Sequence, residues 1–408
     1  MVFRFSPIGV TAFTLVFSFS LTACSTASEQ SAPAIETEAT VSAKNDVASN
    51  VEAGRRVVVI DFGGTIAGES KAPNSISYKS GERDITDVVV EMIADIEKAD
   101  GDVPDFLKTA TIDQSLPSGG SSALTEKEWV LLHNRVTDYL ADPSVAGVVV
   151  THGTDTLEET AFFLHLTVKS VKPVVFVGAM RASTQFGADG PLNLYNAMAI
   201  AADRSTVQKG VMVVLNDTVH SARHVTKSHT TAPDTFIARN AGPIGKVRFG
   251  KVRFFGGLTR PHTLATPFDA NKLLDGPADA DATKRKRTVD ILYHYAGNRG
   301  DDFRDTIKRG SDGIVYASSG QGALGGDTFR AIRQACKDDP ESVPPILVSS
   351  RTGAGFVSSR PPGEDSPTCP ILVGADDLNP QKARILLLLA LSHGWTSWQD
   401  LKAVFEIY

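Results

Sequence analysis

Residues 147–157 read Gly-Val-Val-Val-Thr-His-Gly-Thr-Asp-Thr-Leu. The run of valines is typical of a strand that is buried on both faces, because it contains no alternating polar positions. A glycine then turns the chain and presents Thr154 and Asp155 side by side. A second apolar strand, residues 57–60, is followed in the same way by Gly63-Gly64-Thr65. Two such strand ends predict a hydroxyl nucleophile beside its activating partner.

Apolar strand-like runs alternate with helical segments on both sides of this stretch. We expect strands over 57–60, 148–151, 174–178 and 211–215, and helices over 87–99, 125–140, 156–168 and 193–202. Thr125 and Glu128 form a capping-box pattern at the start of the second helix. Continuous apolar strands separated by helices predict an α/β fold with a larger N-terminal domain, built on a doubly wound, mainly parallel sheet. Ligands of such sheets bind at the carboxyl ends of the strands, where Thr65 and Thr154 lie.

The pattern weakens between residues 223 and 287 and then resumes in a smaller C-terminal α/β domain. Its expected elements are strands over 289–294, 313–317 and 345–349 and helices over 327–336 and 380–392. We place the N-terminal domain at 55–265 and the C-terminal domain at 287–408. The Pro-, Ala- and Asp-rich segment 266–286 is interpreted as the linker between them.

The N-terminus has the pattern of an export signal followed by a spacer. An apolar run from Ile8 to Leu21 predicts a signal peptide over residues 1–23 rather than a membrane span. Leu21-Thr22-Ala23-Cys24 resembles the bacterial lipoprotein processing box, which implies lipidation of Cys24 and a periplasmic, outer-membrane-anchored protein. An ordinary cleaved signal is the alternative. Residues 24–54, rich in Ala, Ser, Thr and Glu, are expected to be a disordered tether.

Composition is that of a soluble globular protein and does not favour a nucleic-acid partner. The 408 residues are 42% hydrophobic and 22% charged, as in a soluble globular protein with a sizeable core. A net charge of −6 gives no reason to expect a nucleic-acid partner, and the basic residues 284–287 are interpreted as part of a solvated linker. With Cys24 lipidated, Cys336 and Cys369 remain, and the sequence leaves open whether they form a disulfide.

The residues around the strand ends suggest how a hydroxyl would be activated. A threonine hydroxyl is a weak nucleophile that needs a base or a charge network. Asp155 can anchor a substrate ammonium or orient a cation, and Lys227 is a candidate for that cation. A relay of Thr154, Lys227 and Asp155 would repeat the hydroxyl–base–orienter arrangement of hydrolytic triads. Alternatively, Gly-Gly-Thr only turns the chain and Lys227 is a solvated surface lysine.

Several motifs together resemble one enzyme family. They are Thr-His-Gly-Thr-Asp-Thr-Leu-Glu-Glu-Thr-Ala at 151–161, Val-Gly-Ala-Met-Arg at 177–181, Ala-Asp-Gly-Pro at 188–191, Asn-Leu-Tyr-Asn at 193–196, Asn-Asp-Thr at 216–218 and Leu-Asn-Pro-Gln-Lys-Ala-Arg at 378–384. With these motifs the chain resembles the bacterial L-asparaginases of the amidohydrolase type from about residue 56 to 408. The resemblance implies a cofactor-free hydrolase without a catalytic metal, which converts L-asparagine to L-aspartate and ammonia.

The resemblance also implies roles for single residues. Thr65 matches the family's nucleophilic threonine, and Tyr78 matches the tyrosine that assists it from a mobile lid. Thr154, Lys227 and Asp155 match the second hydroxyl, its lysine and the aspartate that also contacts the substrate α-amino group. Backbone groups near Ala179 and Thr154 would stabilise the negative charge on the amide oxygen. A homotetramer of close dimers, each site completed by a neighbour, is implied as well.

The chain departs from the family pattern at several positions. Phe62 replaces the usual threonine before the two glycines, so the rate or the substrate fit is expected to differ. An apparent insertion leaves Ser115 and Ser121 as rival ligands of the substrate α-carboxylate. Gln321 and Glu364 match positions that bear on the choice between asparagine and glutamine. A glutamine-preferring hydrolase therefore stays open, as does a non-catalytic amino-acid-binding lipoprotein.

Two further patterns point to cofactors and are interpreted differently. Gly320-Gln-Gly-Ala-Leu-Gly325 satisfies a dinucleotide-binding pattern, but the family resemblance makes it a loop near the active site. His220, His224 and His229 suggest a metal site, although their segment contains no cysteine and flanks Lys227. We expect polar loop residues rather than metal ligands.

Overall fold

The computed structural model describes residues 55–117, 119–274, 287–359, 369 and 371–408. The predicted signal peptide 1–23, the tether 24–54, linker residues 275–286 and Glu364 lie outside these described residues. None of the helices in the described ranges is long and apolar enough to cross a membrane.

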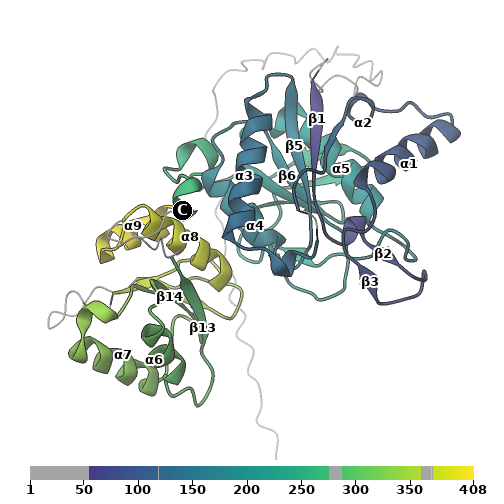
Figure 1. Cartoon of the computed structure of the whole chain (residues 1–408). Helices are drawn as coiled ribbons and strands as arrows, with labels where there is room; N and C mark the ends of the chain where they lie inside the picture. Colours follow the sequence, from purple (N-terminus) through teal and green to yellow (C-terminus); the bar gives the residue numbers. More distant parts are fainter. Residues whose placement is uncertain (1–54, 118, 275–286, 360–368, 370) are drawn as a thin grey trace, which may run out of the picture. The chain divides into compact units, whose positions relative to one another are not determined.

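The N-terminal domain is built on an eight-stranded sheet in the order β12-β11-β8-β7-β6-β5-β1-β4 (Figure 1). The strands β4, β1, β5, β6 and β7 run parallel, and β8, β11 and β12 continue the sheet antiparallel at one edge. The bounds are β1 Arg56–Phe62, β4 Thr111–Asp113, β5 Val145–His152, β6 Val174–Val177, β7 Val211–Leu215, β8 Thr218–Ser221, β11 Gly245–Arg248 and β12 Lys251–Phe254. The mainly parallel sheet predicted from the apolar runs is confirmed. Its antiparallel edge was not predicted.

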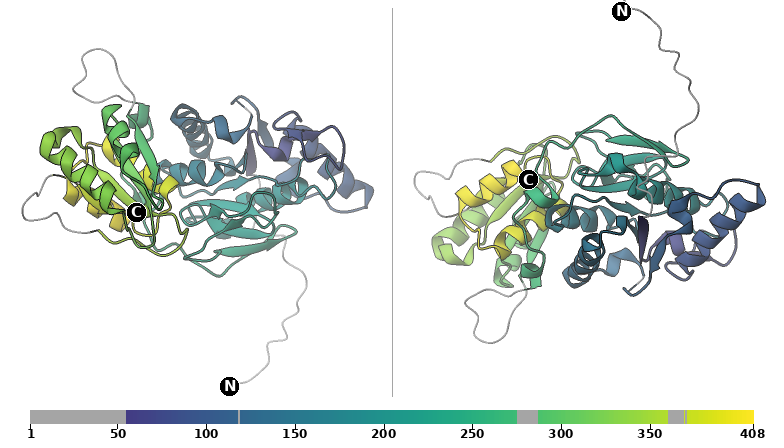
Figure 2. Two further views of the ribbon diagram at one scale, coloured as in Figure 1. Left: turned by 90° about the horizontal axis from the view of Figure 1, so that it is seen from below. Right: turned by 90° about the horizontal axis from the view of Figure 1, so that it is seen from above.

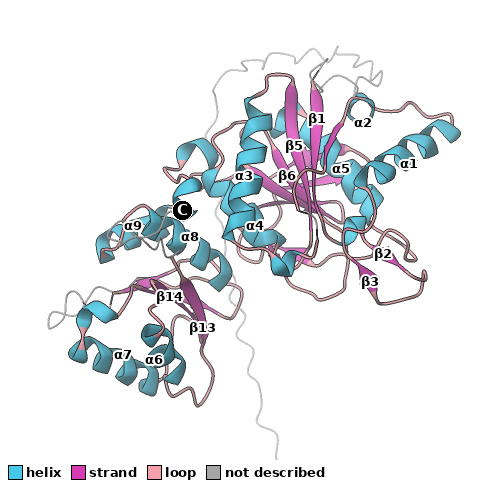
Figure 3. Cartoon of the chain, viewed as in Figure 1, coloured by secondary structure: helices cyan, strands magenta, loops and turns pink. Residues whose placement is uncertain are grey.

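Helices cover both faces of this sheet (Figure 3). Successive residues of β1 alternate between two cores: Val58 and Ile60 pack with α3 and α4, whereas Val57 and Val59 pack with α1, α2 and α5. The helices are α1 Ile85–Lys98, α2 Asp105–Lys108, α3 Glu126–Ala141, α4 Leu157–Thr167 and α5 Gly190–Ala202. The capping box of Thr125 and Glu128 opens α3 as predicted.

The C-terminal domain contains a four-stranded parallel sheet in the order β13-β14-β15-β16. Its strands are β13 Val289–Tyr293, β14 Gly313–Ser318, β15 Ile346–Ser350 and β16 Leu372–Gly374, and its helices are α6 Asp301–Lys308, α7 Gly326–Asp338, α8 Pro380–Ser392 and α9 Trp398–Ile407. Ile314 and Tyr316 pack with α6 and α7, and Val315 packs with α8, so helices lie on both sides of the strands (Figure 2). Sequence reasoning missed α6, α9 and β16.

The first part of the expected linker is packed rather than extended. Phe268 and Leu273 are buried in the core shared with α8, and a 3₁₀ turn spans Asn271–Leu274. Pro267 and Asp269 belong to this packed part, so the Pro- and Asp-rich composition by itself did not distinguish it from a linker. Burial of an aromatic ring and a leucine stabilises this segment against the folded body.

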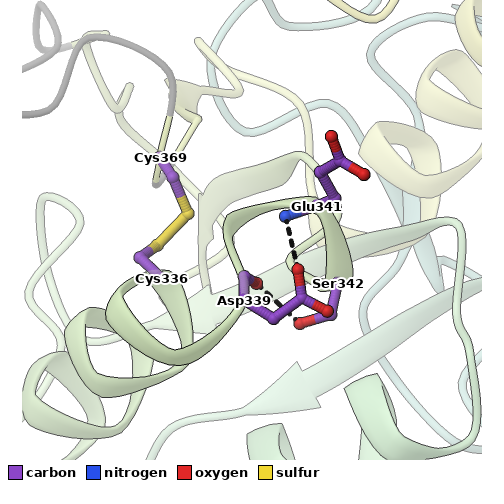
Figure 4. Close-up of a disulfide and its surroundings, with 5 residues drawn as sticks. All are labelled: Cys336, Asp339, Glu341, Ser342 and Cys369. Atoms are coloured by element: carbon purple, nitrogen blue, oxygen red, sulfur yellow. Dashed lines mark hydrogen bonds between the residues drawn. A yellow bond between two sulfur atoms is a disulfide. The ribbon is translucent and has the colours of Figure 1, made fainter.

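Cys336 and Cys369 form a disulfide, which the sequence had left open (Figure 4). Cys336 lies near the end of α7, directly before a 3₁₀ turn over Pro340–Ser342. Asp339 caps this turn by accepting a hydrogen bond of 3.2 Å from the Glu341 backbone N–H. The disulfide therefore ties the end of α7 to the segment that precedes β16.

Candidate active site

The register of β1 against β5 brings the two predicted strand ends together. Phe62 pairs with His152, so the glycine turns that follow both strands begin at the same level of the sheet. Gly64 has a φ of 98°, and a Cβ atom there would lie 2.5 Å from the backbone nitrogen of Gly153. Only glycine permits this approach. The turns that carry Thr65 and Thr154 are therefore in contact.

Thr65 is directly linked to the tyrosine of the predicted lid. Its Oγ1 shares a hydrogen bond of 2.6 Å with the hydroxyl of Tyr78. Thr65 is buried, whereas 40% of Tyr78 is exposed. Tyr78 lies in the short hairpin of β2 (Glu69–Ser70) and β3 (Tyr78–Lys79). In this conformation the hairpin covers the threonine.

Thr154, Asp155 and Lys227 form a connected group. Lys227 Nζ donates hydrogen bonds to Thr154 Oγ1 at 2.9 Å and to Asp155 Oδ1 at 2.7 Å. The Lys227 side chain is 16% exposed and that of Asp155 is 68% exposed. The lysine therefore lies between a buried hydroxyl and a solvent-facing carboxylate. This is the geometry that the relay requires.

These residues surround one pocket of about 340 Å³. It is lined by Thr65, Ile76, Tyr78, Ser80, Gly120, Ser121, Gly153, Thr154, Asp155, Met180, Arg181, Gln185, Lys227, Thr230 and Thr231. All five residues predicted to be catalytic are in this set. Ser121 is in it as well, whereas Ser115 and Ala179 are not.

The two rival serines differ in their surroundings. Ser121 packs against the turn after β5. A Cβ atom added to Gly153 in this turn would lie 2.6 Å from Ser121 Oγ. Its carbonyl accepts a hydrogen bond of 2.9 Å from Thr156 Oγ1. Ser115 instead donates its backbone N–H to Asp113 at the end of β4. Of the two, Ser121 is the serine that the fold brings to the pocket.

The loop after β6 is held rigidly beside the pocket. Asp189 accepts hydrogen bonds from the backbone N–H groups of Met180 and Arg181, at 3.1 and 2.9 Å. Asn193 Nδ2 donates to the carbonyl of Gly178 at 3.1 Å. Ala179, between these anchors, is fully buried, so any role in the pocket must come from its backbone.

Phe62 lies in the core and not in the pocket. It is 1% exposed and its ring packs against the ring of His152, with centroids 5.6 Å apart. The backbone N–H of Phe62 donates to Thr151 Oγ1 at 3.2 Å. The departure from the family pattern therefore acts on the packing beneath the two turns and does not add bulk to the wall of the pocket.

His152 supports the turn that carries Thr154. Its Nδ1 is 2.7 Å from the Gly153 carbonyl oxygen and its Nε2 is 2.9 Å from Thr160 Oγ1. A carbonyl only accepts, so Nδ1 carries the proton and Nε2 accepts from the threonine. Burial lowers the pKa of His152 to about 4, so the ring is neutral at pH 7.

Buried charged side chains on α4 and α8 hold strand β9 (Thr226–Lys227) in place. Glu158 accepts from Thr226 Oγ1 and from Asn379 Nδ2, both at 3.0 Å. Lys382, on α8, donates to the carbonyls of Arg223 and Val225. Burial lowers the pKa of Lys382 to about 8. Helices α4 and α8 thereby fix the position from which Lys227 extends.

Sequence reasoning missed several pocket residues because they carry no chemical motif. Gln185 accepts a hydrogen bond of 2.7 Å from the Ala182 N–H and donates to the Ser75 carbonyl in the lid. Thr230 and Thr231 reach the pocket from the loop after Lys227. In the sequence, only their position shortly after Lys227 pointed to Thr230 and Thr231 as pocket residues, and nothing pointed to Gln185.

The glycine-rich loop and two of the three histidines that suggested cofactors are engaged elsewhere in the fold. The Gly320–Gly325 loop connects β14 to α7, and Gln321 and Gly322 line a separate cavity of about 190 Å³ in the C-terminal domain. His224 Nδ1 lies 3.4 Å from Asp377 Oδ2, and His229 Nδ1 accepts from two backbone N–H groups. Among the described residues, no group of three or more His, Cys, Asp or Glu could hold a metal ion.

The parallel sheets and the hydroxyl-lined pocket define a two-domain α/β protein suited to nucleophilic chemistry. Residues 56–260 match the family described as Asparaginase, N-terminal, and residues 288–405 match the Glutaminase/Asparaginase C-terminal domain. The chain belongs to the asparaginase family.

Individual relatives match over nearly their whole length. L-asparaginase 2 of Bacillus subtilis is 37% identical over 392 residues, which is 96% of each chain. The glutaminase-asparaginase of Acinetobacter glutaminasificans is 36% identical over 353 residues, 86% of this chain and 98% of its own. The crystal structure of a probable cytoplasmic L-asparaginase from Campylobacter jejuni has a TM-score of 0.74 at 36% identity, and the match covers 87% of this chain and all of that one.

Proposed function

We propose that this protein hydrolyses L-asparagine to L-aspartate and ammonia, with Thr65 as the nucleophile. The observation that carries the proposal is the common pocket of Thr65, Tyr78, Thr154, Asp155 and Lys227. Two hydroxyls, each hydrogen-bonded to a group that can take part in proton transfer, face the same space. Binding alone requires neither partner, so the arrangement favours turnover over a non-catalytic amino-acid-binding protein.

The reaction has two steps. Thr65 Oγ1 attacks the side-chain amide carbon, and its proton leaves through Tyr78 toward the departing nitrogen. The C–N bond breaks, ammonia is released and an acyl ester forms on Thr65. A water molecule then attacks the ester, with Thr154, Lys227 and Asp155 moving the proton, and aspartate leaves. Backbone N–H groups near Thr154 and Ala179 would stabilise the oxyanion in both steps.

The remaining pocket residues account for recognition of an α-amino acid. Asp155 exposes its carboxylate to the pocket and is suited to bind the substrate ammonium group. Ser121, rather than Ser115, is suited to bind the α-carboxylate, because it is the serine that lines the pocket. Neither role needs a cofactor.

A direct test is Thr65→Ala in the chain that begins at residue 55. We expect release of ammonia from L-asparagine to fall by at least about 10⁴-fold, because no other hydroxyl replaces the nucleophile. Binding of L-aspartate, measured by calorimetry, should largely remain. Thr109→Ala, at an exposed helix end, is the matched control. Ammonia release that persists in Thr65→Ala would refute the assignment.

A glutamine-preferring hydrolase is the second candidate. The pocket volume of about 340 Å³ leaves room for a side chain that is one methylene longer, and one relative is named a glutaminase-asparaginase. Steady-state kinetics with both amino acids distinguish the two candidates. A kcat/KM for L-glutamine equal to or above that for L-asparagine would favour the second.

We also propose the organisation implied by the sequence motifs. The domains would be 55–265 and 287–408, joined by the linker that ends at residue 286. Cys24 would carry the lipid that anchors the protein on the periplasmic side of the outer membrane, after removal of residues 1–23. The active form would be a homotetramer in which a neighbouring subunit completes each site, with Glu364 as its candidate residue. Lipid analysis of the mature N-terminus and light scattering test these points.

A further inference from the structure

The hairpin of β11 and β12 forms one edge of the N-terminal sheet and carries four cations on its outer face. Lys246 pairs with Arg253, and Arg248 pairs with Lys251. Directly paired residues of antiparallel strands project from the same side, and all four side chains are exposed. Val247 points the other way into the core. The hairpin thus has an apolar inner face and a basic outer face.

The basic outer face is not neutralised by its surroundings. Lys246 Nζ donates to Thr218 Oγ1 at 2.6 Å, and in the described part of the chain none of the four cations has a carboxylate within ion-pair distance. Asp217, whose carbonyl pairs with the Val247 N–H, directs its carboxylate to Asn196 at 2.9 Å. Like charges placed opposite each other destabilise a sheet. Such a cluster, in a protein of net charge −6, indicates an anionic partner.

Two exposed aromatic rings accompany the cations. Phe249, at the turn of the hairpin, is 66% exposed, and Phe255, directly after β12, is 65% exposed. The backbone N–H of Phe255 donates to the Ile244 carbonyl at 3.0 Å, so the strand pairing continues. By strand alternation Phe255 then lies on the same side as Lys251 and Arg253. Charges alone would serve to protect a sheet edge from aggregation, but exposed phenylalanines would not.

We propose that the outer face of the β11–β12 hairpin binds the surface of an anionic phospholipid bilayer. Lys246, Arg248, Lys251 and Arg253 contact the phosphate headgroups, and Phe249 and Phe255 enter the interface beside them. Basic residues next to exposed aromatic rings are the combination that proteins use to lie on a membrane. The binding is a property of the folded domains and needs no acyl chain on Cys24.

The test uses the chain from residue 55 to 408, which contains every described helix and strand and lacks Cys24. Its binding to vesicles of 30% phosphatidylglycerol in phosphatidylcholine is measured by co-sedimentation, with pure phosphatidylcholine for comparison. Each basic residue near such a surface contributes about fivefold to binding. The fourfold variant Lys246→Gln, Arg248→Gln, Lys251→Gln, Arg253→Gln should therefore bind about 10²-fold more weakly or worse.

The matched control removes the same charge elsewhere. Lys127, Lys272, Lys308 and Arg333 are exposed and scattered over other elements, and their fourfold replacement by Gln should leave most of the binding. A third variant, Phe249→Asn with Phe255→Ser, separates the aromatic contribution, since Asn accepts the positive φ at position 249. Its remaining binding should disappear when salt is raised from 0.1 to 0.5 M.

Three outcomes would overturn the proposal. The first is equal binding of the wild-type protein to anionic and neutral vesicles. The second is equal binding by the hairpin variant and the scattered-charge control. The third is a hairpin variant that binds vesicles as the wild type does but has a different molecular mass by light scattering. This result would show that the face is an interface between copies of this chain. Ammonia release by the hairpin variant checks folding and is expected to stay at the wild-type level.

Discussion

Glu158 Oε1 accepts a hydrogen bond of 3.0 Å from Thr226 Oγ1, on the residue directly before Lys227. The second carboxylate oxygen accepts from Asn379, which also caps helix α8. One buried carboxylate therefore connects α4, α8 and the strand that carries the lysine of the proposed relay. Glu158 does not line the pocket, so it acts through the position of Lys227.

Removing this carboxylate should weaken both activity and folding. Glu158→Ala leaves Lys382, 3.9 Å away, as a buried charge without its carboxylate. We expect a loss of about 3–5 kcal/mol in the free energy of unfolding and a drop in kcat larger than the change in KM. Glu158→Gln, which keeps one acceptor, should recover part of kcat. Exposed Glu97→Gln is the control. An unchanged kcat in Glu158→Ala at a temperature where it is folded would contradict the positioning role.

The relay of Thr154 and Lys227 is expected to behave as one unit. Thr154→Val and Lys227→Met each remove one partner of the 2.9 Å hydrogen bond with little change in volume. Each should lower kcat by on the order of 10²–10⁴-fold, the usual contribution of positioned acid–base groups. The double variant should be no slower than the worse single variant, because the second change removes nothing further. Losses in kcat that multiply would show that the two residues act separately.

Glu159 should contribute to the pH dependence of the free energy of unfolding. Burial, together with the neighbouring Glu158 charge, raises the pKa of Glu159 to about 7. The folded state then binds more protons than the unfolded state above the unfolded pKa of about 4.3. The contribution of Glu159 is therefore most favourable below pH 4.3 and is lost as pH rises to 7.

Glu159→Gln removes this loss because the amide stays neutral. We expect the variant to be more stable than wild type at pH 8, by roughly 1–3 kcal/mol, and similar at pH 4.3. Urea unfolding at both pH values measures the difference. A stability difference that does not change with pH would show that Glu159 titrates normally.

The disulfide should contribute to stability through the loop it closes. Cys336 and Cys369 are separated by 33 residues in sequence. A loop of this length corresponds to about 3–4 kcal/mol in the chain-entropy description. Cys336→Ser with Cys369→Ser should lower the free energy of unfolding by up to that amount and leave KM nearly unchanged, because neither residue lines the pocket. Dithiothreitol should destabilise the wild-type protein and not the double variant.

The apolar runs were sufficient to predict the longer parallel strands and most of the long helices that cover them. Residues 57–60 and 148–151 lie in β1 and β5, and the helix expected at 125–140 begins at its predicted cap. The short elements were missed for a physical reason. Strands such as β11 and β12 are short, with apolar residues on one face and cations on the other. An alternation over so few residues does not give a clear strand period.

The residues of the candidate site also fall into those that the sequence predicted and those that it could not. Chemically distinctive residues such as Lys227 could be named from their sequence context. The choice between Ser115 and Ser121, the core position of Phe62 and the pocket position of Gln185 could not, because each depends on which loops meet in space.

The sequence by itself determined the α/β class, the two glycine turns and the family motifs, because local apolar pattern and backbone freedom are properties of neighbouring residues. Tertiary structure alone decided that Phe62 and His152 share a register, that Cys336 reaches Cys369 and that Glu158 supports Lys227. These contacts join residues far apart in the chain. These contacts contribute to stability only when packing brings the partners together, and no local sequence pattern shows which distant residues will meet.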